Sequence, residues 1–226
     1  MRAASAAARP LARRGPGRPP GPSQAADVRA RLVAAASRLY AVGGYAGLSF
    51  GTLAARVGIT KPTVFHYFPT KDSLAVAVFD ALGERLEGRA HEWFAAPPTS
   101  FVARLERALR GLVAFYGADP VNAKLVCQGL LDVERLAVDA EHFGVFAEFV
   151  REFAAFLEGG IAAGEFHPDR PLGTIVSIGG VVLFECMLPA GARRRFGGGG
   201  LTLDDRAREV IRFVRRAVVR SPRRTR

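Results

Sequence analysis

Apolar residues recur at three- and four-residue spacing along most of the chain, a pattern typical of helices that bury one face. One such stripe runs from Leu32 to Tyr40, and Gly43 and Gly44 follow it as a C-terminal stop. Another stripe, rich in phenylalanine, covers about residues 139–163. We find no run of alternating apolar and polar residues that predicts a strand. The sequence therefore predicts an all-α protein of about nine helices.

Residues that cap helices mark where the predicted helices begin. Side-chain oxygens of Ser, Thr and Asp accept hydrogen bonds from the backbone N–H groups that the first helical turn leaves unpaired. The candidate caps, in chain order, are Ser49, Thr60, Thr70, Ser100, Asp119 and Thr202. Pro62 falls in the first turn after Thr60, where the missing N–H of proline is harmless. Pro171 begins a further helix, which Pro189 must end.

Residues 47–71 hold two short predicted helices that flank Gly58, with a turn of three or four residues between them. This is the spacing of a helix-turn-helix, in which the second helix enters the major groove of DNA. The segment has no acidic residue, as a surface that faces phosphates requires. We expect Val57, Val64 and Phe68 to lie in the core and the polar residues of the second helix to face outward.

Basic residues are concentrated in the first third of the chain. Residues 1–71 hold eleven Arg and Lys residues against one acid, Asp27, whereas the rest is close to neutral apart from an Arg-rich C-terminus. A basic N-terminal module on a neutral body predicts a polyanionic partner for that module. The expected organisation is a disordered basic arm at 1–22, a helix-turn-helix domain at 23–70, a larger helical domain at 71–220 and a basic tail at 221–226.

The helix-turn-helix segment resembles the TetR (tetracycline-repressor-type) family of bacterial regulators. The residues that carry the resemblance are Ser49, Leu53-Ala54, Val57-Gly58-Ile59, the run from Thr60 to Phe68, and Lys71. The specific match covers about residues 28–75. The resemblance implies a homodimer that binds double-stranded DNA. It also implies that the larger domain, residues 71–220, binds a small-molecule effector, mediates dimerisation and changes the separation of the two DNA-reading domains.

The resemblance also suggests roles for individual residues. Base contacts are expected from Lys61, Pro62 and Thr63, and phosphate contacts from Ser49, Thr60, Tyr67 and Lys71. His66 is expected near the rim of this set. Phe65 departs from the family, which usually has Tyr here, so a hydroxyl that commonly bonds a phosphate is missing and the ring can contact a thymine methyl or a sugar. A purely structural role as helix caps is the alternative for Ser49 and Thr60.

The larger domain offers candidates for an effector pocket and for a dimer interface. The pocket candidates are Trp93, Phe115, Tyr116, Cys127, Gln128, His142, Phe146 and Phe153. Their aromatic content predicts an apolar or aromatic effector, although such residues also build cores. For the dimer, small residues between 172 and 188 allow helices to approach closely. A second apolar surface is expected at Ile211, Phe213, Val214 and Val218, with packing inside one chain as the alternative.

Other functional classes find little support in the sequence. It contains no P-loop, nucleophile elbow, dinucleotide-binding fingerprint or Cys/His nucleophile pattern, so we expect neither an enzyme nor a cofactor. The four histidines are scattered, and Cys127 and Cys186 form no CxxC pair, so no metal site is expected. Without a signal peptide or membrane span, a cytoplasmic protein is expected.

The function predicted from these patterns is a dimeric, ligand-responsive transcriptional regulator. Its simplest form is a repressor that a small effector releases from a near-palindromic operator. The alternative is an architectural protein that binds DNA without sequence preference, because the basic termini would also support such binding.

Overall fold

The computed structural model describes residues 22–95, 100–132, 144–167, 170–195 and 199–220, which fold into ten helices. The helices are α1 (Pro22–Gly47), α2 (Phe50–Val57), α3 (Lys61–Tyr67), α4 (Lys71–Phe94), α5 (Phe101–Ala118), α6 (Pro120–Leu131), α7 (Gly144–Ala162), α8 (Pro171–Met187), α9 (Ala190–Arg195) and α10 (Leu203–Val218). Besides these helices, the described residues contain an isolated antiparallel β-bridge between Phe166 and Val219. The predicted all-α fold is confirmed.

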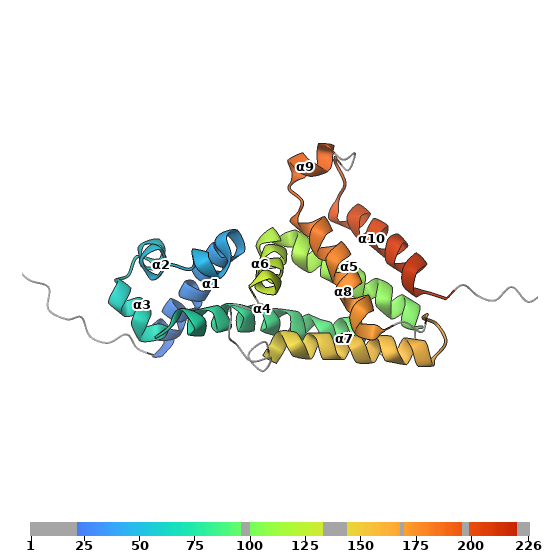
Figure 1. Ribbon diagram of the computed structural model, residues 1–226, viewed down its shortest axis with the longest axis horizontal. Coiled ribbons are helices and arrows are strands. Elements are labelled where there is room, and N and C mark those ends of the chain that lie inside the picture. Colours follow the sequence, from blue (N-terminus) through green and yellow to red (C-terminus); the bar gives the residue numbers. More distant parts are fainter. Residues whose placement is uncertain (1–21, 96–99, 133–143, 168–169, 196–198, 221–226) are drawn as a thin grey trace, which may run out of the picture.

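Helices α1, α2 and α3 gather at one end of the molecule, and α4 runs from there into the larger remainder (Figure 1). We call residues 22–70 the head and the described residues from 71 onward the body. Within the body, α4 packs along α7, and α5 packs against α10. Helix α6 contacts α1 of the head on one side and α8 of the body on another. Head and body are therefore joined by the shared helix α4 and by the α1–α6 contact.

The six predicted caps are confirmed. Single caps are formed by Ser49 at α2, Thr60 at α3, Ser100 at α5 and Asp119 at α6. Thr70 and Thr202 form capping boxes at α4 and α10, with Ser73 and Asp205 as their partners. Pro62 and Pro171 lie in the first turns of α3 and α8, as expected.

The first helix matches its prediction in part. Its regular helical backbone is interrupted at Gly44, where φ is 58°, so the predicted glycine stop lies where expected, but a short helical continuation beyond this kink extends α1 to Gly47. This left-handed conformation favours glycine. At the kink the N–H of Tyr45 donates to Oδ2 of Asp132, 2.7 Å away, just beyond the end of α6. The kink is therefore a point of contact between head and body that local sequence signals could not show.

Two further differences concern the body. The Phe-rich helix is described from Gly144, so its expected start at residue 139 lies outside the described residues. Helix α9 was not predicted, because Ala190–Arg195 has no periodic apolar residue and no buried side chain. The expected tail at 221–226 and the arm, apart from Pro22, also lie outside the described residues.

The buried side chains form one continuous core that extends through both head and body. Tyr40 of α1 meets Phe79 of α4 edge to face, with ring centroids 5.1 Å apart. Gly129 of α6 lies against the same Phe79 ring, since a Cβ at that glycine would be 2.6 Å from a ring carbon. The absence of a side chain at Gly129 thus allows α6 to approach α4 where the head begins.

A buried ion pair joins α8 to α10. Nε of Arg206 lies 2.9 Å from Oε1 of Glu185, and a second guanidinium nitrogen donates to the backbone oxygen of Glu185 at 2.9 Å. The Arg206 side chain is almost fully buried whereas Glu185 is partly exposed, so removing the Glu185 carboxylate would leave a buried charge without its counter-ion. This pair fixes α10 against α8 along one side of the body.

Candidate functional site

Helix α2 has eight residues, and a cap at its first turn stabilises so short a helix. Oγ of Ser49 accepts a hydrogen bond from the N–H of Thr52 at 3.4 Å. Leu53, Ala54 and Val57 supply the buried face of α2. Gly58 then takes the left-handed conformation, with φ at 76°, and its N–H donates to the oxygen of Ala54. The predicted glycine turn is therefore confirmed.

Helix α3 is positioned by a cap at its start and by two buried residues. Oγ1 of Thr60 accepts from the N–H of Thr63 at 3.4 Å, and the two threonine hydroxyls lie 2.8 Å apart in a second hydrogen bond. Val64 and Phe68 are buried, as predicted. With these residues inside, the outward face of α3 and its start carries Thr60, Lys61, Pro62, Phe65 and His66, which are all exposed.

Helix α1 contacts the ends of both α2 and α3 through two arginines. A guanidinium nitrogen of Arg31 donates to the backbone oxygen of Val57 at 2.7 Å, at the end of α2. The guanidinium of Arg29 lies 5.3 Å from the ring centroid of Phe68, at the end of α3. Two arginines of α1 therefore anchor α2 and α3 by contacts that reach across the head.

The head has no acid from residue 28 to residue 71, and the first carboxylate after this interval is engaged. The hydroxyl of Tyr45 donates to Oδ1 of Asp72 at 2.5 Å. That hydrogen bond, aided by partial burial, raises the pKa of Tyr45 to about 12. The exposed face of α3 consequently presents cations and neutral groups, which is the charge pattern that phosphates attract.

Lys71 has partners inside the chain that sequence reasoning missed. Its ammonium lies 4.3 Å from the ring centroid of Tyr45 and donates to the oxygen of Ala46 at 3.4 Å. A basic residue in the first turn of a helix is unfavourable to the helix dipole, and the sequence reasoning ascribed it to a phosphate. The aromatic ring and the carbonyl give Lys71 a structural role at the corner between α1 and α4.

Phe50 is a second residue that sequence reasoning missed. Its ring meets Phe65 at a centroid distance of 4.7 Å and an angle of 67°, which joins the first turn of α2 to the exposed face of α3. The available signal was a large apolar residue directly after the cap Ser49, outside the buried stripe of α2. The ammonium of Lys61 lies 5.8 Å from the Phe65 ring centroid.

The structure brings the predicted DNA-contacting residues together in two groups. Thr60, Lys61, Thr63 and Phe65 lie at the start of α3 and along its first turn and a half. His66 and Tyr67 lie at its end, with their rings 5.5 Å apart. Ser49 and Pro62 are exposed next to the first group. Lys71 lies apart, beyond the end of α3.

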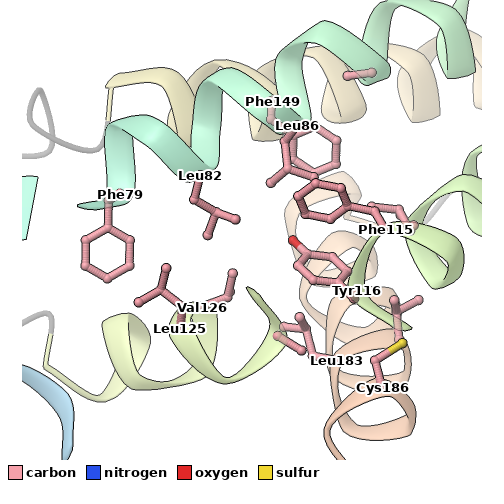
Figure 2. Close-up of a cluster of buried hydrophobic side chains, with 14 of the residues drawn as sticks. Phe79, Leu82, Leu86, Phe115, Tyr116, Leu125, Val126, Phe149, Leu183 and Cys186 are labelled. Carbon is pink, nitrogen blue, oxygen red and sulfur yellow. The ribbon is translucent and has the colours of Figure 1, made fainter. Parts of the chain in front are cut away.

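Some of the candidate pocket residues lie together where α5, α6 and α8 meet. Phe115 and Tyr116 of α5 are buried and pack edge to face at 5.0 Å (Figure 2). Burial raises the pKa of Tyr116 above its usual value, and the nearby thiols of Cys186 and Cys127 raise it further. Burial also raises the pKa of Cys127, so neither hydroxyl nor thiol is ionised near neutral pH.

The other pocket candidates lie elsewhere. Trp93 packs against Gly111 of α5, and Phe153 stacks near Phe94 with centroids 5.1 Å apart. Gln128 points toward the head, because its Oε1 lies 3.1 Å from where a Cβ on Gly44 would be. His142 lies outside the described residues, and the side chain of Phe146 is not described. The six described candidates therefore do not form one cluster.

The apolar residues of α10 that were predicted to form a dimer surface are partly buried and partly exposed. On α10, Ile211, Val214 and Val218 are buried in the chain's own core, whereas Phe213 is exposed. Three of the four residues expected on an open surface are thus core residues, and for these the packing alternative is correct. Between α8 and α10 lies an open groove of about 550 Å³ lined in part by Gly173, Ser177 and Phe213.

Metal binding and membrane insertion find no support in the part of the chain that the structure describes. There, His, Cys, Asp and Glu residues do not gather in groups of three or more that could hold a metal ion. None of the helices in the same residues combines the length and the apolar character needed to cross a membrane.

Residues 32–78 match a family model described as "Bacterial regulatory proteins, tetR family". The HTH-type transcriptional regulator EthR of Mycolicibacterium smegmatis is 28% identical over 104 residues, which are 46% of this chain and 48% of the relative. The HTH-type transcriptional repressor Rv3405c of Mycobacterium tuberculosis is 39% identical over 70 residues, 31% of this chain and 37% of the relative. The chain thus matches about half or less of the length of these curated relatives.

A solved structure extends the likeness to the body. AibR, in complex with isovaleryl coenzyme A and operator DNA, superposes with a TM-score of 0.63 at 19% identity, over 82% of this chain and 97% of that chain. At that identity the likeness shows a shared fold. The head gives the more specific match, since the matched residues begin in α1, include the capped reading helices and end within α4. The head of this chain, residues 32–78, is therefore similar to the tetR family of bacterial regulatory proteins.

Proposed function

We propose that this chain is a DNA-binding transcriptional regulator that works as a homodimer and responds to a small molecule. Its simplest form is a repressor that an apolar or aromatic effector releases from a near-palindromic operator. The observation that carries the proposal is the exposed face of α3, which follows a capped α2 and a tight turn in a head without an acid from residue 28 to 71. Such a face suits a major groove flanked by phosphates.

The exposed residues of α3 carry the proposed DNA contacts. Lys61, Pro62 and Thr63 contact bases, and Ser49, Thr60 and Tyr67 contact phosphates. Lys71 adds a phosphate contact from the α1–α4 corner, where Tyr45 already holds its ammonium. His66 contributes at the rim. These roles are supported by the position of each residue on α2, α3 and the adjoining turns, and by the exposure of Ser49, Thr60, Lys61 and Pro62, whereas Thr63 and Tyr67 are half-buried.

Dimerisation is proposed at the outer face of α8. Leu172, Val176 and Phe184 are exposed there by 62%, 75% and 62% at four- and eight-residue intervals, and Gly180 completes the same stripe. Exposed apolar stripes of this kind mark interaction surfaces. Phe213 of α10, which is 62% exposed, adds to it across the groove. A two-fold axis at α8 and α10 would form a four-helix interface between two copies.

The effector is proposed to bind in the body near Tyr116. The ring of Phe115 packs edge to face against the ring of Tyr116, and the thiol of Cys127 lies close enough to the Tyr116 hydroxyl to raise its pKa. Together they offer an aromatic surface with polar groups beside it. Cys127 belongs to α6, which also contacts α1 of the head. A ligand in this region is therefore one helix away from the DNA-binding head, which supports communication between the two.

Selection of bound sequences from random DNA tests the DNA-binding proposal. Wild-type protein should enrich a near-palindrome, and Lys61→Ala should cost about 1–3 kcal/mol at that site and relax the preference at one position per half-site. Arg151→Ala is the matched control, because it removes one exposed cation from α7, far from the head. Enrichment of no sequence, with a steep salt dependence, would favour the architectural alternative.

Sedimentation of Gly180→Arg tests the dimer. A Cβ at Gly180 would meet no atom within 4 Å, so the variant should fold, yet it would place a charge in the proposed interface. We expect monomers that stay helical and lose specific DNA binding. Gly88→Arg on α4 is the control, since that glycine is equally open but lies away from α8. A Gly180→Arg dimer that persists at micromolar concentration would remove this interface from the proposal.

A further inference from the structure

The exposed face of α3 carries one large apolar side chain amid polar ones. Phe65 is 46% exposed, although α3 is already anchored in the core by Val64 and Phe68. A phenylalanine left half in water forgoes much of the stabilisation that full burial would give it. The core therefore does not explain why an aromatic residue stands at this position.

Phe65 is nevertheless held in place. Phe50 of α2 packs edge to face against it, with centroids 4.7 Å apart. Phe50 is itself half-buried in the first turn of α2, beside the cap Ser49. Two rings from two helices thus pack together into one apolar cluster, which we call the Phe50–Phe65 pair. Because Phe50 already restricts the Phe65 ring, an apolar group can bind it with little further loss of side-chain freedom.

The polar groups beside the pair differ in whether they already have hydrogen-bond partners within the chain. The hydroxyls of Thr60 and Thr63 bond each other at 2.8 Å, and Thr60 also caps α3. Lys61, one turn before Phe65, is exposed and keeps its ammonium 5.8 Å from the Phe65 ring. The surface therefore offers the apolar Phe50–Phe65 pair with the ammonium of Lys61 beside it.

The major groove displays one apolar group on its base edges, the C5-methyl of thymine, and lysine pairs with O6 and N7 of guanine. We propose that Phe65 is a specificity-determining residue that binds the C5-methyl of one thymine in each half-site, beside a guanine that Lys61 contacts. Phe50 is the positioning residue that holds the Phe65 ring. This inference rests on the proposed function, because it requires that α3 enter the major groove.

Uracil replacement tests the inference directly, since uracil differs from thymine by the absence of this methyl group. In the operator selected by the wild-type protein, each thymine is replaced singly by uracil and the dissociation constant is measured. We expect one thymine per half-site at which the loss weakens binding about four-fold, and about sixteen-fold when both half-sites are changed, as burial of one methyl predicts.

Protein variants then locate the contact. Phe65→Ala should bind the thymine and uracil operators within about 1.5-fold of each other, because no ring remains to contact the methyl. Phe50→Ala should reduce the uracil effect in part. Arg38→Ala, which removes an exposed cation from α1 that has no proposed contact with DNA, should leave the effect unchanged. Circular dichroism checks that each variant is folded.

The outcomes separate the inference from the proposed function. A preferred operator whose affinity is indifferent to every uracil replacement would overturn the inference alone, and that measurement needs no variant. A uracil effect that persists in Phe65→Ala would also overturn it, by placing the methyl against another residue. Selection that yields no preferred sequence would overturn the proposed function and this inference with it.

Discussion

The helices of the head and of the body begin with different chemistry. In the head and at its junction with α4, the caps are the neutral hydroxyls of Ser49, Thr60 and Thr70, and the box at Thr70 is completed by Ser73. In the body, the carboxylate of Asp119 caps α6, and Asp205 completes the box at α10. A carboxylate is the better partner for the positive end of a helix dipole.

The difference agrees with the DNA contact proposed for the head. A carboxylate at the start of α2 or α3 would stabilise the helix, but it would repel a phosphate backbone at the same place. The head thus gives up some helix stability and keeps its outer face free of negative charge. In the body, acids take part in the capping of α6 and α10, whereas the hydroxyl of Ser100 caps α5. Capping by neutral hydroxyls throughout the head suits the proposed contact of that region with phosphates.

The cores of the two regions differ as well. Helices α2 and α3 have eight and seven residues, so each would be only marginally stable in isolation. The side chains with which they pack into the core are mostly aliphatic. In the body, longer helices are joined by phenylalanine rings, such as Phe94 against Phe153 and Phe156, each at 5.1 Å. The comparison predicts that body substitutions have the larger effect on stability, and head substitutions the larger effect on DNA binding.

The largest effect is expected from Phe153→Ala. The ring is almost fully buried among other rings, so its loss should lower the free energy of unfolding by about 3–5 kcal/mol. Val64→Ala in the head is the matched variant and should cause a smaller loss. Because the core is continuous, both variants should shift one transition in chemical denaturation. Two separate transitions, each sensitive to only one variant, would show that head and body unfold independently.

A smaller effect is expected at the contact between the regions. Asp132→Ala removes the acceptor of the Tyr45 N–H, and it removes the carboxylate that lies near the buried hydroxyl of Tyr40. That hydroxyl has no hydrogen bond of normal geometry, and burial followed by the Asp132 charge raises its pKa well above the usual value. The expected loss of unfolding free energy is about 1–3 kcal/mol.

Glu209→Ala provides the control for Asp132, because it removes an exposed carboxylate from α10. Urea denaturation of both variants gives the measurement. Equal stability of Asp132→Ala and the wild type would mean that the hydrogen bond at the kink does not hold the head against the body.

The smallest effect on stability is expected from lowering the pH, which protonates Asp205 at the cap of α10. Hydrogen bonds from the hydroxyl and the N–H of Thr202, together with Arg208, lower the pKa of Asp205 to about 2. A lowered pKa contributes stability above the ordinary value near 4, and this contribution is lost as the pH falls toward 2. The neutral caps of the head have no such dependence.

Thermal unfolding of the wild type and of Asp205→Asn between pH 5 and pH 2 measures this contribution. The stability advantage of the wild type should shrink as the pH falls, and Thr60→Ala should differ from the wild type by the same amount at every pH. An advantage for Asp205 that is independent of pH would argue that its charge has no part in the cap.

Local signals predicted most of the head. Caps such as Ser49 and Thr60, and the turn glycine Gly58, act within three or four residues of their own position, so the sequence alone locates them. Val64 and Phe68 follow from the apolar spacing on α3. The same locality explains why the six predicted caps are confirmed, including Thr202 far from the head.

Contacts between distant residues could not be predicted in this way. The bond from Tyr45 to Asp132 spans 87 positions, and no periodicity points to it. Helix α8 is apolar on both sides, with Ile175 buried and Val176 exposed, so spacing could not tell core from surface. For the pocket candidates, the sequence identified suitable residue types but could not show which of them lie next to one another in the fold.

The continuity of α4 also limits how heads and bodies can be exchanged by recombination. The helix begins at Lys71, where composition suggested a domain boundary, yet Leu74, Ala75 and Val78 are fully buried just after it and Phe79 already meets Tyr40 of α1. A hybrid gene joined at residue 70 would separate these residues from the head that packs on them. A junction past Phe79 would keep them, but it would lie within a continuous helix. Each inserted or deleted residue there would turn the head by about 100° and shift it by about 1.5 Å relative to the body. Viable hybrids should therefore preserve the number of residues in α4.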